Sequence, residues 1–261
     1  KRDHVKAPGE YAKIMLPELT FPYLIPGQEV LLDDGKIHLK IVEKAENVTE
    51  NGGENTQEKR YFAKVLWGGL LKSRKSAALP GAKIYPPTLT NSDLANIKIA
   101  NEMGVTGVMQ PFVRDHSDLE CVKEALREAG AEDIRLFAKI ENMDGVRKLE
   151  KLLPAADEIV IARGGLGNAV HLWDLPGVQR QISEKCRAAG KPFMVVTQML
   201  ASMERSPVPT RAEVNDIFHA VMDGAASIMV TGETAVGDYP VEVIRYMVNT
   251  VRSAEKKKID K

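Results

Sequence analysis

From about residue 88 onward, the chain alternates short apolar stretches with longer stretches of helical periodicity. The apolar stretches are continuous, which is typical of strands covered by helices on both faces. Because each predicted strand is followed by a helix, the pattern indicates an α/β fold with a parallel sheet. The predicted strands are 107–112, 135–140, 158–163, 193–197 and 227–231; the predicted helices begin near Asn91 or Ser92, and then cover 117–129, the region through Val146 and Leu153, 177–189, 211–222 and 241–254.

Two architectures contain such a sheet. One is an open, doubly wound sheet, and the other is a portion of a (β/α)8 barrel in which five of the eight βα units are present. Both architectures bind their ligands beyond the carboxyl ends of the strands. The residues that follow each predicted strand are therefore the candidates for a functional site.

The first part of the chain has the pattern of β-structure. In "EVLLDDGKIHLKIV", residues 33–35 separate two apolar stretches, which predicts a hairpin. A polar, glycine-containing loop at 47–60 precedes another predicted strand that begins at Tyr61. The segment "KSRKSAALPGAKIYPP" is rich in Pro and Gly and predicts a linker or domain boundary. We therefore expect a small β domain over 1–80 and the α/β domain over 81–261.

Composition excludes several classes of protein. The 36 basic residues balance the 36 acidic residues, and the pI is near 7.1, so we expect no nucleic-acid partner. No apolar run approaches the roughly 20 residues that cross a bilayer, and the stretch "KRDHVKAPGE" lacks a signal-peptide core. Cys121 and Cys186 have no C-x-x-C spacing, which favours reduced thiols in a cytoplasmic protein without a membrane partner.

Polar residues follow all five predicted strands. Lys139 and Glu141 are two residues apart, so they lie on the same side of an extended strand. Helix capping explains Thr231 or Asn142 as well as function does. It does not explain Lys139, because a positive charge at a helix N-terminus opposes the helix dipole. In strand order, the candidates are Arg114; Lys139, Glu141 and Asn142; Arg163 and the glycines after it; Thr197 and Gln198; and Thr231, Gly232, Glu233 and Thr234.

The glycines at 164, 165 and 167 have two interpretations. They do not fit the G-x-G-x-x-G fingerprint of dinucleotide-binding proteins. They indicate either a sharp strand-to-helix connection or backbone amides exposed to an incoming anion. If the amides bind an anion, the other candidates fit the same ligand: cationic side chains would bind phosphate, a carboxylate would bind Mg²⁺, and hydroxyls would transfer a proton. This interpretation predicts a magnesium-and-phosphate pocket.

Several long motifs resemble those of one enzyme family. "AKIENMDGV", "IARGGLG", "VVTQMLASMERSPVPTRAEVNDIFHAVMDGA" and "IMVTGETAVGDYPVEVI" resemble consecutive strand-end motifs of the pyruvate kinase family, in its order and spacing. "DDGKIHLKI" and "KSRKSAALPGA" resemble the later part of that family's small β domain, a lid inserted after the third barrel strand. The resemblance implies a (β/α)8 barrel and phosphoryl transfer from phosphoenolpyruvate to ADP, with Mg²⁺ or Mn²⁺ and usually K⁺.

The resemblance also implies roles for particular residues. Lys139 would neutralise the transferred phosphoryl group, and Glu141 would bind the divalent metal. The amides of Gly164 and Gly165 and the hydroxyl of Thr197 would bind the carboxylate of the substrate. Thr231, where the family usually has Ser, and Glu233 would relay a proton to the enolate. The segment "PTRAEVND" resembles a subunit contact, which implies a homo-oligomer.

The chain departs from the family pattern in three ways. Gly165 stands where the family motif Ala-Arg-Gly-Asp-Leu-Gly has an Asp that supplies the second metal carboxylate. The first three barrel strands, with the family's potassium ligands, have no counterpart in this sequence, and neither does the C-terminal effector domain. We therefore expect a partner segment or an assembly to complete the barrel, since exposed edges of a parallel sheet are unfavourable in water.

Three functional hypotheses follow. The first is a pyruvate kinase-like enzyme with impaired metal binding, because removal of one preorganised electrostatic group typically lowers the rate about 100- to 1000-fold. The second is a catalytically silent homologue that serves as a structural or regulatory subunit. The third is another magnesium-enolate reaction, such as that of an aldolase or lyase, which Lys139 and Thr197 make less favourable.

Overall fold

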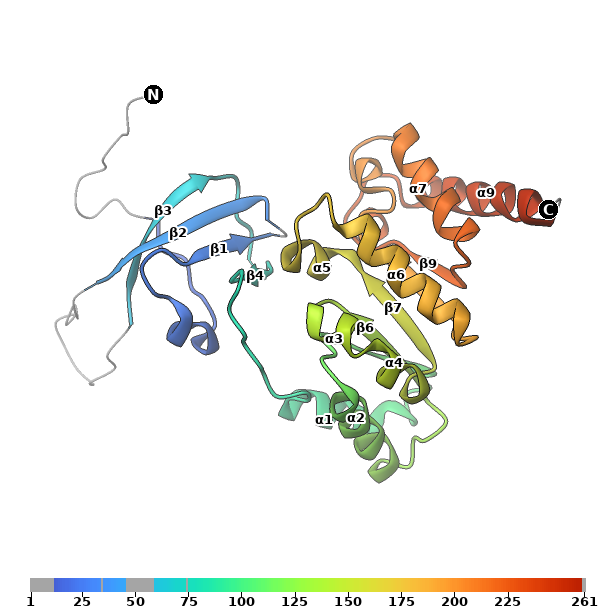
Figure 1. The fold of residues 1–261 in the computed structure, drawn as a ribbon, viewed down its shortest axis with the longest axis horizontal. Helices are drawn as coiled ribbons and strands as arrows, with labels where there is room; N and C mark the ends of the chain where they lie inside the picture. Colours follow the sequence, from blue (N-terminus) through green and yellow to red (C-terminus); the bar gives the residue numbers. More distant parts are fainter. Residues whose placement is uncertain (1–11, 34, 46–58, 74, 260–261) are drawn as a thin grey trace. The chain divides into compact units, whose positions relative to one another are not determined.

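The computed structural model describes residues 12–33, 35–45, 59–73 and 75–259 (Figure 1). The chain forms two compact units, Lys1–Pro86 and Pro87–Lys261. The division therefore falls at Pro86 rather than at residue 80. The interpretation of these units as a lid-like domain and a barrel portion stays a prediction.

The first unit contains an antiparallel sheet with the strand order β3-β2-β1-β4. The predicted hairpin is confirmed, because Leu32 at the end of β1 pairs with Ile37 at the start of β2. Asp33 and Gly35 in the connection have φ of 50° and 83°, the left-handed region that Gly favours and Asp tolerates. The bounds are η1 Glu18–Tyr23, β1 Glu29–Leu32, β2 Ile37–Lys44, β3 Tyr61–Trp67 and β4 Ala77–Ala78.

The segment predicted as a linker or domain boundary contains a short strand. Ala77 and Ala78 form β4, which pairs with β1, and Leu79 is buried in the core of this unit. Ala82 and Ile84 also pack against that core. Backbone pairing and apolar contacts therefore hold this Pro-rich segment against the small sheet. Most of the predicted loop at 47–60 lies outside the described residues.

The second unit is built on a five-stranded sheet in which every pair of neighbours is parallel. The strand order is β5-β6-β7-β8-β9, which is the order along the chain. This order lacks the reversal that defines a doubly wound sheet, and it is the order found around a (β/α)8 barrel. The α/β prediction is confirmed. The bounds are β5 Gly107–Gln110, β6 Arg135–Ile140, β7 Glu158–Ala162, β8 Phe193–Val196 and β9 Ser227–Met229.

Helices connect these strands, and several of their boundaries differ from the predictions; the last helix, for instance, continues to Ile259 instead of ending near Ala254. The first helix is capped by Thr90, not by Asn91 or Ser92, because the Thr90 hydroxyl accepts from the amide of Asp93 while the Asp93 carboxylate accepts from the amide of Thr90. The helix predicted through Val146 and Leu153 is interrupted at Lys148. None of the helices in the described ranges is long and apolar enough to cross a membrane. The bounds are α1 Asn91–Ala100, α2 His116–Glu128, α3 Met143–Arg147, α4 Leu149–Leu152, η2 Leu153–Ala155, α5 Arg163–Ala169, α6 Leu175–Ala188, η3 Ala201–Glu204, α7 Arg211–Met222, α8 Gly232–Ala235 and α9 Pro240–Ile259.

The two faces of the parallel sheet differ in how well they are buried. Alternate strand residues such as Ile140, Ile161 and Val195 join helix residues in one large core. The residues between them form a much smaller cluster, in which Phe137, Met194 and Met229 are only partly buried. We call this second surface the inner face, because a closed barrel would enclose it.

A buried ion pair fixes the start of α2. The carboxylate of Asp118 accepts hydrogen bonds from the backbone N–H and guanidinium of Arg114 and from the hydroxyl of Thr88. Burial alone would raise the pKa of Asp118, but the hydrogen bonds from Arg114 and Thr88 outweigh it and lower the pKa to about 2. Arg114, one of the strand-end candidates, thus has a structural partner.

We predict that Asp118→Asn lowers the free energy of unfolding by about 2 kcal/mol at pH 7, because a pKa shift of nearly two units corresponds to that amount. The lowered pKa means that the stabilisation is fully present above pH 3.8, the ordinary value, and is lost as the pH falls through about 2. Urea titrations between pH 7 and pH 2 should therefore show the two proteins converge in acid. The control Glu150→Gln alters an exposed ion pair with Lys185 and should change little. A difference between wild type and Asp118→Asn that does not depend on pH would contradict this account.

Candidate active site

Lys139 and Glu141 form an ion pair at the carboxyl end of β6. The distance between Lys139 Nζ and Glu141 Oε1 is 2.6 Å. Ile140 between them is buried in the helix-facing core, so Lys139 and Glu141 belong to the opposite, inner side. The Lys139 side chain is 26% exposed and that of Glu141 is 7% exposed, so the pair is accessible mainly through the lysine.

Helix capping is an alternative explanation for two strand-end residues, Asn142 and Thr231, and it applies to one of them. The side-chain oxygen of Asn142 accepts from the amide of Gly145 and caps α3, while its Nδ2 donates to the carbonyl of Val113. The capping explanation is therefore correct for Asn142. It is not correct for Thr231, which precedes α8 without a side-chain cap bond.

The glycine run directly follows β7 and forms the first turns of helix α5, so the strand passes into the helix without a separate turn. Arg163–Ala169 are helical, so positive φ is not the reason for glycine here. Close packing is the reason. A Cβ on Gly164 would lie 3.2 Å from Cγ2 of Thr197, and one on Gly165 would lie 2.6 Å from Cβ of Glu141 and 3.0 Å from its carbonyl oxygen. The start of α5 thus contacts the ends of both neighbouring strands.

Thr197 follows β8 in an unusual backbone conformation. Its φ is 85°, and that of Gln198 is 54°. Positive φ is a genuine outlier for a β-branched residue such as Thr. Nε and Nη2 of Arg163 donate to the carbonyl oxygen of Thr197 at 3.0 and 2.5 Å. The backbone of the turn at Thr197 is therefore stabilised by the guanidinium of Arg163, which leaves the Thr197 hydroxyl out of these contacts.

The carboxylate of Glu233 is buried and accepts hydrogen bonds from two backbone amides. Its Oε1 accepts from the amide of Leu200 at 3.2 Å, and its Oε2 accepts from the amide of Thr231 at 2.8 Å. Glu233 is 2% exposed. It connects the segment after β8 to the segment after β9 and orients the backbone of Thr231, whose side chain is exposed.

Contacts therefore join five of the sequence candidates into one group, and we call this group the strand-end site. It consists of Lys139, Glu141, Gly164, Gly165 and Thr197. Glu233 reaches the segment after Thr197 through the amide of Leu200, and it connects Thr231 to the site by accepting from the amide of Thr231. One relevant residue escaped the sequence reasoning: Asp216, which binds Arg163 from α7. Since 53 positions separate these two residues, no local spacing signals their contact.

The strand-end site offers one carboxylate to a divalent cation. Glu141 has the ligand chemistry that Mg²⁺ prefers, and such sites are commonly completed by substrate oxygens and water. Within the described parts of the chain, no three His, Cys, Asp or Glu side chains are grouped as metal ligands would be. The donor set is thus suited to a cation shared with a substrate and not to an all-protein metal site.

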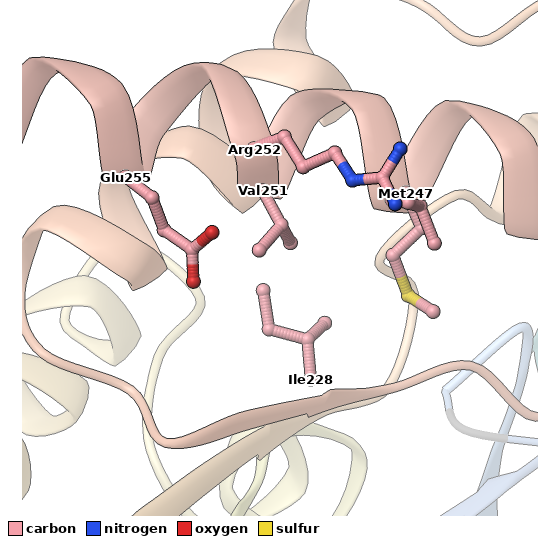
Figure 2. A pocket seen from close by; sticks show the side chains of 6 residues that line it. Ile228, Met247, Val251, Arg252 and Glu255 are labelled. Carbon is pink, nitrogen blue, oxygen red and sulfur yellow. The ribbon is translucent and has the colours of Figure 1, made fainter.

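A separate groove lies between β9 and α9 (Figure 2). It has a volume of about 270 Å³. Ile228 from the strand faces Met247 and Val251 of the helix, and Arg252 and Glu255 lie at its rim. The groove contains none of the strand-end candidates, so it is not part of the same site.

Comparison with known proteins gives one consistent match. The family model described as "Pyruvate kinase, barrel domain" matches residues 8–244 of this chain. Pyruvate kinase of Geobacillus stearothermophilus is 39% identical over 233 residues, which cover 88% of this chain and 38% of the relative. Pyruvate kinase of Bacillus licheniformis is 38% identical over 229 residues, with 88% and 37% covered.

A more distant relative shows the same partial coverage. Pyruvate kinase of Chlamydia trachomatis serovar D is 34% identical over 242 residues, which cover 93% of this chain and 47% of the relative. The chain therefore spans less than half of the length of these relatives.

We predict that Gly165→Ala destabilises the second unit by about 1–3 kcal/mol, because the added methyl group meets the backbone of Glu141 and overpacking typically costs this much. Thermal or urea unfolding measures the effect. The matched control is Gly177→Ala in α6, where a Cβ meets no atom within 4 Å and helix propensity favours Ala. Equal stability of Gly165→Ala and wild type would mean that α5 does not approach Glu141 this closely.

Proposed function

Because this chain belongs to the pyruvate kinase family, we propose that its strand-end site takes part in phosphoryl transfer from phosphoenolpyruvate to ADP, giving pyruvate and ATP. The observation that supports this most directly is the Lys139–Glu141 pair, in which an ammonium group lies 2.6 Å from a carboxylate oxygen, the ligand type that Mg²⁺ prefers. Since the chain covers less than half of its relatives, the activity is proposed for an assembly that contains the rest of the barrel.

Each residue of the site has a proposed task. The Lys139 ammonium neutralises charge on the phosphoryl group as it moves. Glu141 would hold the divalent cation, Mg²⁺ or Mn²⁺, which when bound supplies positive charge beside the substrate oxygens. The N–H groups of Gly164 and Gly165 lie in the first turn of α5, where amides lack intrahelical acceptors, and with the Thr197 hydroxyl they bind the substrate carboxylate.

The exposed hydroxyl of Thr231 is the group proposed to exchange a proton with the enolate. Glu233 contributes by orienting Thr231, because both carboxylate oxygens already accept amide hydrogens. A potassium ion is expected from the family, but its usual ligands have no counterpart in this chain.

Gly165 favours a second candidate function, that of a catalytically silent homologue with a structural or regulatory role. The place where the family has its second metal carboxylate is here packed against the backbone of Glu141. A weaker metal site follows, since Glu141 is then the sole carboxylate that the described residues bring to the strand-end site. The family match gives no support to the aldolase or lyase hypothesis.

A partner is proposed to complete the barrel. In the described residues, β5 and β9 are the two edges of the parallel sheet, and its inner face is only partly covered. Unpaired strand edges and exposed apolar side chains favour association with further strands. The groove beside β9 offers apolar side chains, including Ile228 and Val251, next to one of these edges (Figure 2). We propose a cytoplasmic assembly, either a homo-oligomer or a complex with a segment that supplies the remaining strands.

Turnover tests the function. In the native assembly, with all its polypeptides and with Mg²⁺ or Mn²⁺, pyruvate should form from phosphoenolpyruvate and ADP. Lys139→Ala should lower kcat/KM at least about 100-fold, as loss of one preorganised charge does. It should also lower the free energy of unfolding by about 1–3 kcal/mol without unfolding the protein, because it leaves the nearly buried Glu141 carboxylate without its counter-ion. The control Lys148→Ala removes an exposed partner of Asp115 and should leave turnover unchanged.

Gly165→Asp distinguishes the two candidate functions in the same assay. Turnover only in this variant would support the silent homologue. Absence of turnover in both the variant and the wild-type assembly would exclude the enzyme. A collapse of stability in Lys139→Ala would instead assign the lysine to a structural ion pair.

Association is tested by native mass spectrometry. The native assembly should exceed the 28.7 kDa of one chain. Val248→Asp places a charge in the groove beside β9 and should release subunits, whereas Asn249→Asp, the next residue along α9, should not. Circular dichroism checks that both variants keep their helices. A wild-type mass equal to one chain would contradict the proposed association.

A further inference from the structure

The turn after β8 is strained. Thr197 and Gln198 are consecutive non-glycine residues with positive φ. Such a conformation is unfavourable for a non-glycine residue and persists only where its surroundings hold it. Since the hydroxyl of Thr197 belongs to the strand-end site, whatever holds this turn also determines where that hydroxyl lies.

Arg163 makes the contacts that hold the turn. Its Nε and Nη2 both donate to the carbonyl oxygen of Thr197, and Nη2 also lies 2.9 Å from Sδ of Met199. The side chain is 13% exposed, so water competes little for these donors. The backbone of the most strained residue is therefore bound by two charged N–H groups from the end of the neighbouring strand.

Asp216 fixes the guanidinium from the other side. Its Oδ2 accepts from Nη1 of Arg163 at 2.5 Å. Asp216 lies in the middle of α7, a helix whose start is secured by the capping box of Thr210 and Glu213. A charge-assisted contact to a well-anchored helix gives Arg163 one preferred orientation.

Gly164 completes the arrangement. Gly164 directly follows Arg163. Because Gly164 has no side chain, the side chain of Thr197 can pack against it; a Cβ on Gly164 would lie 3.5 Å from Oγ1 of Thr197. The Thr197 side chain is thus directed toward the first turn of α5. Arg163 therefore binds the carbonyl oxygen of Thr197, while the side chain of Thr197 packs against Gly164.

We propose that Arg163, anchored by Asp216, is a positioning residue that keeps the turn at Thr197 in its left-handed conformation and so directs the Thr197 hydroxyl toward the substrate carboxylate. The role toward substrate rests on the proposed function, whereas the effect on the turn does not. Lysine cannot replace Arg163, because three directed N–H groups of one planar fork are used at once.

The first test measures the turn without turnover. Amide hydrogen exchange of residues 196–200 should accelerate about tenfold in Arg163→Lys and in Asp216→Asn, as expected for loss of a charged hydrogen bond. The matched controls Arg205→Lys and Asp238→Asn alter an exposed pair of the same kind and should leave this exchange unchanged. Asp216→Asn is the milder variant if Arg163→Lys unfolds. Unchanged exchange in a folded Arg163 or Asp216 variant overturns the proposal.

The second test measures function in the native assembly. Arg163→Lys should lower kcat about 100-fold while KM for ADP stays constant, because a small misplacement of a substrate-binding group has an effect of this size. The double variant with Asp216→Asn should lose little more than Arg163→Lys alone, since both act through one contact. Faster exchange with unchanged kcat would mean that the Arg163–Asp216 contact only stabilises the turn, and it would overturn the positioning role of Arg163. If the wild-type assembly has no turnover, the proposed function fails, and the exchange experiment alone decides whether Arg163 holds the turn.

Discussion

Parallel backbone pairing in chain order is the constraint on which the second unit depends. Because β5 to β9 run in the same direction, their carboxyl ends lie along one edge of the sheet, and residues from distant parts of the sequence meet there. The same pairing separates two faces. One is buried under helices in a large core, and the other carries Lys139 above a small, partly covered apolar cluster.

Close packing around α5 brings the residues of the strand-end site together at this edge of the sheet. Glycine at 164 and 165 lets the first turn of α5 approach Thr197 on one side and Glu141 on the other, at distances that a side chain would prevent. A typical interior tolerates little extra volume, so these contacts connect the position of the Glu141 carboxylate to the position of the helix. Gly165 thus contributes to the site through close packing.

The strand-end site combines charged groups with strained backbone. The Lys139–Glu141 pair is partly buried, and the turn at Thr197 is held by Arg163 and Asp216. Strain of this kind clusters at functional sites because the surrounding structure, not local preference, determines the conformation. Glu233 serves the neighbouring turn in the same way, with both carboxylate oxygens bound to amides.

The sequence by itself determined the α/β class, the five strands, the hairpin at 33–35 and the family, since these depend on periodicity and motifs that act over short distances. It also predicted that Lys139 and Glu141 share one side of β6, which follows from the two-residue repeat of a strand. Tertiary structure alone decided that the start of α5 packs directly against Glu141 and Thr197 and that Arg163 reaches Asp216. These features depend on how close two distant segments come, and no local pattern of residues records that distance.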